Sequence, residues 1–198
     1  MIAQELINHM IPPLKPSDSA EKAVAWMEEL RCNQLPVVEN SKFLGLISEE
    51  IILEENNIDK PISAFELEGI DCAVKNHQHF YDVVKIASDY EVQLVGVVDD
   101  ENEYFGVITV QDTITSFAQT AAVQAPGAII VLSMDARDYS LAEISRLIES
   151  ENAKILGSTI RDDSLDPTKI KLTLKINKTD LSHIVATLER FDYKIIGR

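Results

Sequence analysis

The chain has 198 residues and a mass of 22.1 kDa, and 45% of its residues are apolar, which is enough for one large domain or two compact ones. The formal net charge of −15 argues against a protein that grips a nucleic-acid backbone or an anionic membrane over a broad surface. All of this excess lies in residues 1–126, which hold 7 Lys and Arg against 22 Asp and Glu, whereas residues 127–198 hold 11 of each. The change in composition predicts two units with a boundary near Ala125, Pro126 and Gly127.

Cysteine usage and the N-terminal sequence indicate the cellular setting. Cys32 and Cys72 are the only cysteines and form no CxxC pair, so we expect core or interface thiols, not a disulfide framework or a zinc site. The first 15 residues lack the basic start and apolar run of a signal peptide, and no segment reaches about 18 uninterrupted apolar residues. We therefore expect a soluble, cytoplasmic protein with no membrane partner, no nucleic-acid partner and no metal.

The first 120 residues contain an internal repeat. An offset of 60 places residues 35–38 over residues 95–98, and after one inserted residue 43–48 falls on 104–109. Each copy predicts an extended segment, a helix, a hairpin and a second helix, and Asp18 and Glu21 have capping-box spacing ahead of the first helix. One copy alone could hardly bury its apolar faces, so we expect the two copies to pack together.

This β-α-β-β-α repeat carries two short motifs, a hydrophobic-Pro-Val-Val strand and a Gly-hydrophobic-hydrophobic-Ser/Thr-x-x-Asp junction between strand and helix. With these motifs each copy resembles a CBS domain, and the tandem resembles a CBS pair, or Bateman module. The resemblance covers roughly residues 8–120 and is most specific at residues 106–112. We assign the first repeat to residues 1–60 and the second to residues 61–124, and the resemblance implies a regulatory function.

The junction of the second repeat contains Thr109 at the end of a predicted strand and Asp112 three residues further on. The N-terminus of a helix suits a phosphate, and a carboxylate one turn into the helix can accept the hydroxyls of a ribose. The resemblance implies that Thr109 and Asp112, with Gln111 beside them, bind the phosphate and ribose of an adenosine-type ligand. The same spacing also fits a capping box, in which the Thr hydroxyl and the Asp carboxylate satisfy backbone amides, and both interpretations stay open.

The resemblance further implies that the first repeat completes this cleft. The residues at the matching positions are Ile11, Pro12, Pro13, Gln34, Leu35 and Pro36. The apolar members could form a wall for a purine, although core packing and turn formation explain them as well. In the junction of the first repeat, Ile51 stands where the ribose-binding Asp is expected, and Glu49 and Glu50 would repel a phosphate. We therefore expect at most one nucleotide site per chain.

Three other groups of polar residues invite functional interpretations. Lys15 and Lys75 occupy the same place in each copy and could approach a phosphate, but they are also typical of solvated surface lysines. His77 and His79 could ligate a metal, although without a third ligand nearby a solvated loop is favoured. The acidic turn at residues 99–103 lacks the spacing of a calcium loop, so we expect a solvated hairpin turn.

The last unit, assigned to residues 125–198, has a different pattern. Residues 128–134 form a buried-strand run, Ser140 and Glu143 form a capping box, and residues 170–176 alternate between apolar and polar. The remaining predicted elements are a strand at 154–161, a turn at 162–167, a helix at 179–191 and a strand at 193–196. The order β-α-β-β-α-β predicts a ferredoxin-like domain, so the fold class of the whole chain is α+β.

A unit of this order behind a CBS pair resembles an ACT domain. The resemblance implies amino-acid binding at the interface of paired copies, through an Asp-x-x-Gly type of turn after the first strand. Here Tyr139 stands in the approximate place of the glycine, and tyrosine lacks the backbone freedom of glycine. We therefore expect this domain to serve dimerisation, with amino-acid sensing as the alternative.

No enzyme motif of the GxGxxG, GxxxxGK, GxSxG or HExxH type is present, so we expect no catalytic residues and no required cofactor. The leading hypothesis is a non-catalytic regulatory module that senses AMP, ADP, ATP or an S-adenosyl compound such as S-adenosylmethionine. It would signal to a regulated protein target through a homodimer formed by the CBS pair, the ACT-like domain or both. The alternatives are a ligand-free oligomerisation or docking module and an amino-acid sensor. The acidic composition favours ligands with little negative charge over polyphosphates.

Overall fold

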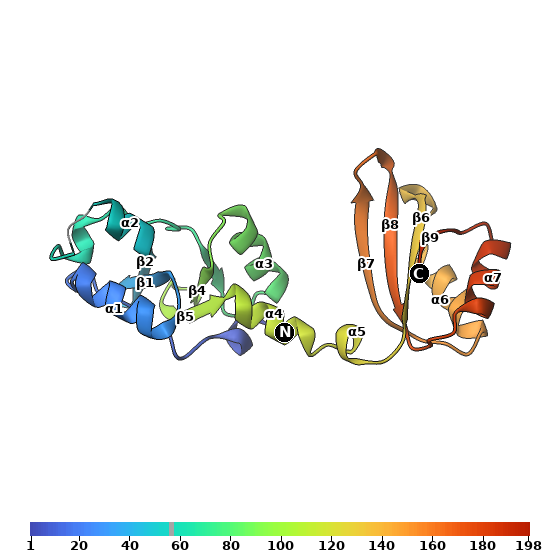
Figure 1. Ribbon diagram of the computed structural model, residues 1–198, viewed down its shortest axis with the longest axis horizontal. Helices are drawn as coiled ribbons and strands as arrows, with labels where there is room; N and C mark the ends of the chain where they lie inside the picture. Colours follow the sequence, from blue (N-terminus) through green and yellow to red (C-terminus); the bar gives the residue numbers. More distant parts are fainter. Residues whose placement is uncertain (56–57) are drawn as a thin grey trace. The chain divides into compact units, whose positions relative to one another are not determined.

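The computed structural model describes residues 1–55 and 58–198, which fold as two compact units, Met1–Phe117 and Ala118–Arg198 (Figure 1). The second unit includes the short helix α5 (Ala121–Gln124), which lies upstream of the boundary suggested by composition. A Cβ placed on Gly157 would lie 2.7 Å from the Cβ of Ala122, so α5 packs directly on the strand that contains Gly157. The mixed α+β class predicted from the sequence is confirmed.

The first unit holds two copies of similar order. The first copy contains η1 (Ala3–Leu6), α1 (Ala20–Leu30), β1 (Gln34–Glu39), β2 (Lys42–Ser48) and α2 (Glu49–Glu54). The second copy contains η2 (Ile62–Ala64), β3 (Ala73–Lys75), α3 (Phe80–Asp89), β4 (Leu94–Val98), β5 (Tyr104–Thr109) and α4 (Val110–Ala118). Strand β3 runs parallel to β4, which pairs with β5 in an antiparallel hairpin, and β1 and β2 form the matching hairpin of the first copy.

Two local predictions for the first copy differ from the structure. The expected first strand is reduced to a single parallel bridge between Leu14 and Val37, because the prolines on either side cannot donate to a strand ladder. The expected capping box at Asp18 and Glu21 is wrong. The N-cap of α1 is Ser19, whose hydroxyl accepts a hydrogen bond from the amide of Lys22, while the Asp18 carboxylate accepts one from the amide of Lys15.

The two copies exchange their N-terminal segments. Asn8, which precedes the first copy, forms an antiparallel bridge with Val107 of β5, and Glu68, which precedes the second copy, does the same with Leu46 of β2. The hairpin tips also meet, and the rings of Phe43 and Tyr104 stack with centroids 6.3 Å apart. The buried residues of both copies form one continuous core. The copies thus fold as one unit, as expected from the small apolar face of each.

The second unit is a four-stranded antiparallel sheet with two helices. Its elements are β6 (Ala128–Asp135), η3 (Ala136–Asp138), α6 (Leu141–Ser150), β7 (Ile155–Asp163), β8 (Asp166–Ile176), α7 (Ser182–Arg190) and β9 (Lys194–Gly197). The strand order β7-β8-β6-β9 is that of a ferredoxin-like domain (Figure 1). Alternate residues of β8, such as Leu172 and Leu174, are fully buried against Ile144 of α6 and Leu188 of α7. The N-cap half of the predicted capping box is confirmed at Ser140, whose hydroxyl accepts from the amide of Glu143 at 3.3 Å.

Candidate functional site

The junction between β5 and α4 is a reciprocal cap. Thr109 Oγ1 accepts a hydrogen bond from the Asp112 amide at 2.9 Å, while Asp112 Oδ2 accepts from the Thr109 amide at 3.1 Å and from Thr109 Oγ1 at 2.6 Å. The capping interpretation of Thr-x-x-Asp is therefore confirmed. Because both contacts of the carboxylate use Oδ2, the second carboxylate oxygen is not needed for the cap.

A third group, which sequence reasoning missed, fixes the same carboxylate oxygen. Asn8 Nδ2 donates to Asp112 Oδ2 at 3.0 Å, and the Asn8 amide donates to the carbonyl of Val107 at 2.8 Å. Asn8 is separated from Asp112 by 104 residues, so only the exchange of N-terminal segments brings it here. With three donors on Oδ2, Asp112 Oδ1 has no hydrogen bond within the described part of the chain.

Asp112 lies at the edge of a cleft of about 880 Å³, a volume typical of small-molecule sites. Its polar lining includes Asn8, Thr109, Gln111 and Asp112, and its apolar lining includes Ile11, Leu30, Val92 and Leu94. Of these, Leu30 ends α1 and Val92 follows α3, so the cleft joins both copies. Apolar walls beside a few convergent polar groups are what a flat heterocycle with a polar substituent requires.

The structure separates the residues that the resemblance placed together. Thr109, Gln111, Asp112 and Ile11 line the Asp112 cleft, and after Ile11 the side chain of Pro12 is half-buried and that of Pro13 is exposed. Leu35 and Pro36 are buried in β1. Gln34 lines a different cleft, where its Nε2 donates to Glu68 Oε1 at 2.7 Å and its Oε1 accepts from the Gln93 amide at 2.9 Å.

That other cleft, of about 690 Å³, is the counterpart of the Asp112 cleft in the first repeat. Ser48 caps α2 by accepting from the Ile51 amide, so the hydroxyl has the role of Thr109, but Ile51 offers no carboxylate. The acidic residues of the lining are Glu49, Glu50, Glu54, Glu68 and Glu91. This surface repels anions and has no carboxylate at the position that matches Asp112.

One cation lines the Asp112 cleft within the described residues, and it comes from the end of α1. Arg31 is the C-cap of this helix in a left-handed conformation with φ of 54°, and its amide donates to the carbonyls of Glu28 and Met27. Glu91 has the matching position after α3, with φ of 55°, and lines the same cleft. The repeat therefore places opposite charges at equivalent positions. A sequence search centred on helix N-termini could not find Arg31, although its 60-residue offset from Glu91 was a usable signal.

Cys32 follows Arg31 and also lines the Asp112 cleft. It is half-buried, and burial raises the pKa of its thiol above the usual value, while Cys72 is fully buried. For Cys72, burial first and then the nearby carboxylates of Asp71 and Glu68 raise the thiol pKa to about 11. Both thiols are therefore protonated at neutral pH, which favours packing over nucleophilic roles.

Lys75, His77 and His79 make local contacts. Lys75 Nζ donates to the Asp99 carbonyl and to Asn102 Oδ1, both at 2.6 Å, and so braces the acidic turn. His79 Nδ1 accepts from the Tyr81 amide at the start of α3, and His77 lies 3.9 Å from Asp100. No group of three or more His, Cys, Asp or Glu side chains suited to a metal ion occurs within residues 1–55 and 58–198. Among the same residues, no helix is long and apolar enough to cross a membrane.

Comparison with known proteins identifies the first unit. The family model of the CBS domain matches residues 3–57. A solved CBS domain pair/ACT domain protein from Thermotoga maritima superposes with a TM-score of 0.54 at 16% identity, over 60% of this chain and 98% of that one. The first copy matches the CBS family, and the first unit as a whole has the fold of a CBS domain pair. The crystal structure of CBSX2 in complex with AMP gives a TM-score of 0.51 at 15% identity, over 60% of this chain and 96% of that one.

Two curated relatives from Methanocaldococcus jannaschii match parts of the chain. Inosine-5'-monophosphate dehydrogenase is 24% identical over 152 residues, which is 75% of this chain and 30% of the enzyme. An uncharacterised protein is 29% identical over 100 residues, which is 50% of this chain and 33% of that protein. The chain spans about a third of the length of these relatives.

Proposed function

We propose that the CBS pair is a non-catalytic regulatory module that binds one adenosine-type ligand per chain in the Asp112 cleft. One observation carries the proposal: Asp112 Oδ1 has no hydrogen bond within the described part of the chain and lies at a cleft with apolar walls. A ribose hydroxyl can donate to this oxygen, and the purine can pack on Ile11, Leu30 and Val92. The AMP complex of a protein with the same fold supports the ligand class.

The fixed geometry of Asp112 suits this function. Three donors hold Oδ2, so the carboxylate cannot rotate freely, and Oδ1 is oriented before the ligand arrives. Such preorganisation reduces the entropy lost on binding. The first repeat offers no equivalent, because Ile51 replaces the carboxylate and five glutamates line its cleft.

The proposal is tested by thermal unfolding with adenosine, AMP, ADP, ATP and S-adenosylmethionine. A ligand at about 100 times its Kd adds roughly 2.7 kcal/mol, which raises the melting temperature by several degrees. In Asp112→Asn the amide oxygen can still accept from Thr109 and Asn8. An NH2 group, which can only donate, replaces Oδ1. We therefore expect a near-normal melting temperature and a greatly reduced ligand shift.

Glu50→Gln, at the position of Gln111 in the first repeat, is the matched control and should keep the full shift. The absence of a shift with every compound would rule out the function. An equal shift in Asp112→Asn would show that ligand binds elsewhere.

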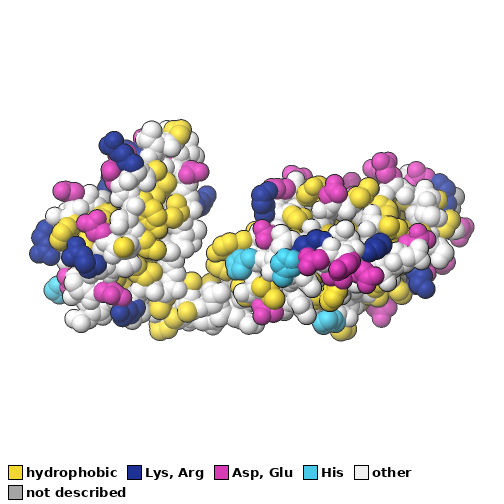
Figure 2. All heavy atoms as spheres, turned by 180° about the vertical axis from the view of Figure 1, so that it is seen from behind, with side chains coloured by type: hydrophobic (Ala, Val, Ile, Leu, Met, Phe, Trp, Pro, Cys, Tyr) yellow, Lys and Arg dark blue, Asp and Glu magenta, His cyan; other side chains and the backbone are white. Residues whose placement is uncertain are grey.

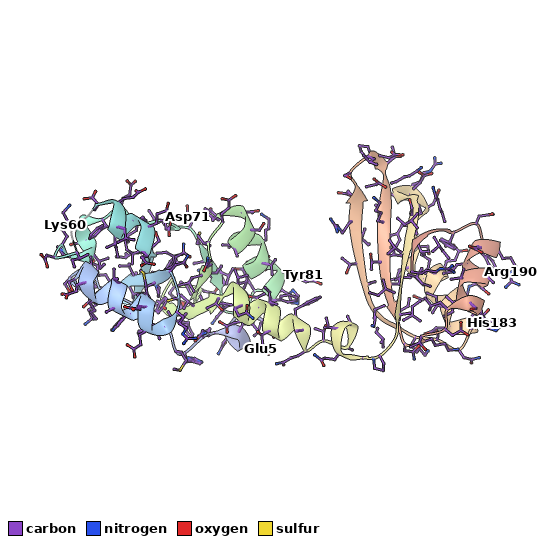
Figure 3. The ribbon with its side chains drawn as sticks, viewed as in Figure 1. Glu5, Lys60, Asp71, Tyr81, His183 and Arg190 are labelled. Atoms are coloured by element: carbon purple, nitrogen blue, oxygen red, sulfur yellow. The ribbon has the colours of Figure 1, made fainter. Side chains whose placement is uncertain are left out.

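We further propose that the module signals as a homodimer through α3 and α4. An apolar groove of about 330 Å³ between these helices is lined by residues that include Val84, Val110 and Ile114, and Val84 and Ile114 are 46% and 55% exposed. Tyr81 also projects from the start of α3 (Figure 3). The corresponding face of the first repeat carries Glu28 and Glu49 in place of Ser88 and Val110. Two such faces from two chains would repel each other. An apolar face without charges at its centre can pair with itself about a twofold axis.

For the second unit we propose an ACT-like role in assembly, ahead of amino-acid sensing. Tyr139 packs on the core of this unit with φ of −67°, so its backbone does not adopt a conformation that needs glycine. If any of the twenty amino acids raises the melting temperature, amino-acid sensing is favoured over a role in assembly.

A further inference from the structure

Phosphate binding at the N-terminus of α4 is limited by the cap itself. The Val110 amide donates to the Gln93 carbonyl at 3.0 Å, and the Asp112 amide donates to Thr109 Oγ1 at 2.9 Å. Two of the first three amides of the helix are thus engaged, and the Asp112 carboxylate adds a negative charge beside the third. An anionic group of a ligand in this cleft therefore needs a donor from another element.

Arg31 is placed to be that donor. It lines the cleft together with Asp112, its side chain is exposed, and it forms no ion pair within residues 1–55 and 58–198. The left-handed C-cap fixes its backbone, because its amide is held by the carbonyls of Glu28 and Met27. A guanidinium has the fork geometry that matches phosphate oxygens in a bidentate contact.

The charges around the cleft limit how much anionic charge it can accept. Arg31 is opposed by Glu91 and Asp112 in the same lining, and the first unit as a whole is strongly acidic, as Figure 2 shows on one of its faces. One phosphate can pair with the guanidinium, whereas each further phosphate adds charge that no other cation of the described lining compensates.

We propose that Arg31 makes the Asp112 cleft selective for a nucleoside with a single phosphate, and that Glu91 selects against di- and triphosphates. This inference rests on the proposed function of the cleft. It assigns a specificity role to two residues at equivalent positions of the repeat, where one attracts and the other repels the same ligand group.

The test is isothermal titration calorimetry of the full chain with adenosine, AMP and ATP. We expect wild type to bind AMP about tenfold more tightly than adenosine, with AMP affinity falling as salt is raised. Arg31→Gln should bring the affinity for AMP to that of adenosine or below it and abolish its decrease with rising salt, because Glu91 and Asp112 then repel the phosphate. Glu91→Gln should raise ATP affinity several-fold and leave adenosine unchanged.

Arg161→Gln, on β7 of the second unit, is the matched control because it changes the net charge equally outside the cleft. The inference is overturned if Arg31→Gln keeps the preference for AMP over adenosine, or if wild type binds ATP as tightly as AMP. In either case adenosine binding that depends on Asp112 leaves the proposed function intact. If no probe binds wild type, both proposals fail.

Discussion

The two carboxylate oxygens of Asp112 differ in their contacts. Oδ2 accepts from Asn8 and twice from Thr109, which fixes the start of α4 and the N-terminal segment in one arrangement. Oδ1 has no hydrogen bond within the described part of the chain and is the oxygen to which we propose that a ligand donates. A residue with both roles cannot be tested by alanine alone, because Asp112→Ala also removes the hydrogen bonds of the carboxylate to Thr109 and Asn8. The isosteric Asn substitution is therefore the informative one.

Cys32 provides a residue-level probe of the cleft. It is half-buried in the lining, whereas Cys72 is fully buried, so we expect iodoacetamide to label Cys32 alone in the native protein. Because the thiolate is the reactive form and burial raises the thiol pKa, labelling should speed up with rising pH past pH 9.

Saturating AMP should slow the labelling of Cys32 several-fold, as followed by mass spectrometry. The Cys32→Ser variant should remain unlabelled, which confirms the assignment. Labelling at an unchanged rate with bound nucleotide would place the ligand away from this wall of the cleft.

Sequence analysis finds site residues whose contacts are short-range along the chain and misses those whose contacts are long-range. Thr109 and Asp112 could be found because their contact spans one helical turn and has a spacing signature. Asn8 could not, because the exchange of N-terminal segments that brings it to Asp112 is a tertiary event. Arg31 was missed for another reason, since a left-handed residue at a helix C-cap is usually Gly or Asn, and Arg gives no such signal.

At the scale of elements, the two repeats have diverged on the exposed sides of their helices. Ile114 of α4 corresponds to Leu53 of α2, but Leu53 lies beside Glu49 and Glu50. The order of helices and strands was predictable in both repeats because the buried positions keep their periodicity. The first strand of the first repeat was not, since Leu14 lies among prolines and forms only one bridge.

This divergence gives a matched pair of substitutions for the proposed dimer. Ile114→Glu places a charge in the apolar groove of α3 and α4, so we expect a raised dimer Kd, by about tenfold or more. Leu53→Glu makes the same change on the first repeat and should leave the Kd unaltered. Sedimentation velocity over a concentration series measures both. If only Leu53→Glu dissociates the dimer, the interface lies on the first repeat and the proposal is wrong.

At the scale of the whole molecule, the distribution of charge and the separate hydrophobic cores indicate the same two units. The excess of acidic residues falls in residues 1–126, and each unit has its own core, without a shared residue. The division by composition was predictable from sequence, but the exact start of the second unit was not. It depends on Ala122 packing against Gly157, a contact between residues far apart in sequence.

Separate cores predict that a nucleotide stabilises only one unit. Hydrogen exchange of the full chain can follow the slowest amides of β4 and β5 in the first unit and of β6 and β8 in the second. AMP at about 100 times its Kd should slow exchange in the first set roughly 100-fold, because binding adds roughly 2.7 kcal/mol to the opening free energy. The second set should exchange at an unchanged rate, and Asp112→Asn should abolish the effect in the first. Equal protection in both sets would show that the units unfold together. Ligand binding would then stabilise the second unit within the same chain, in addition to any effect through the proposed dimer.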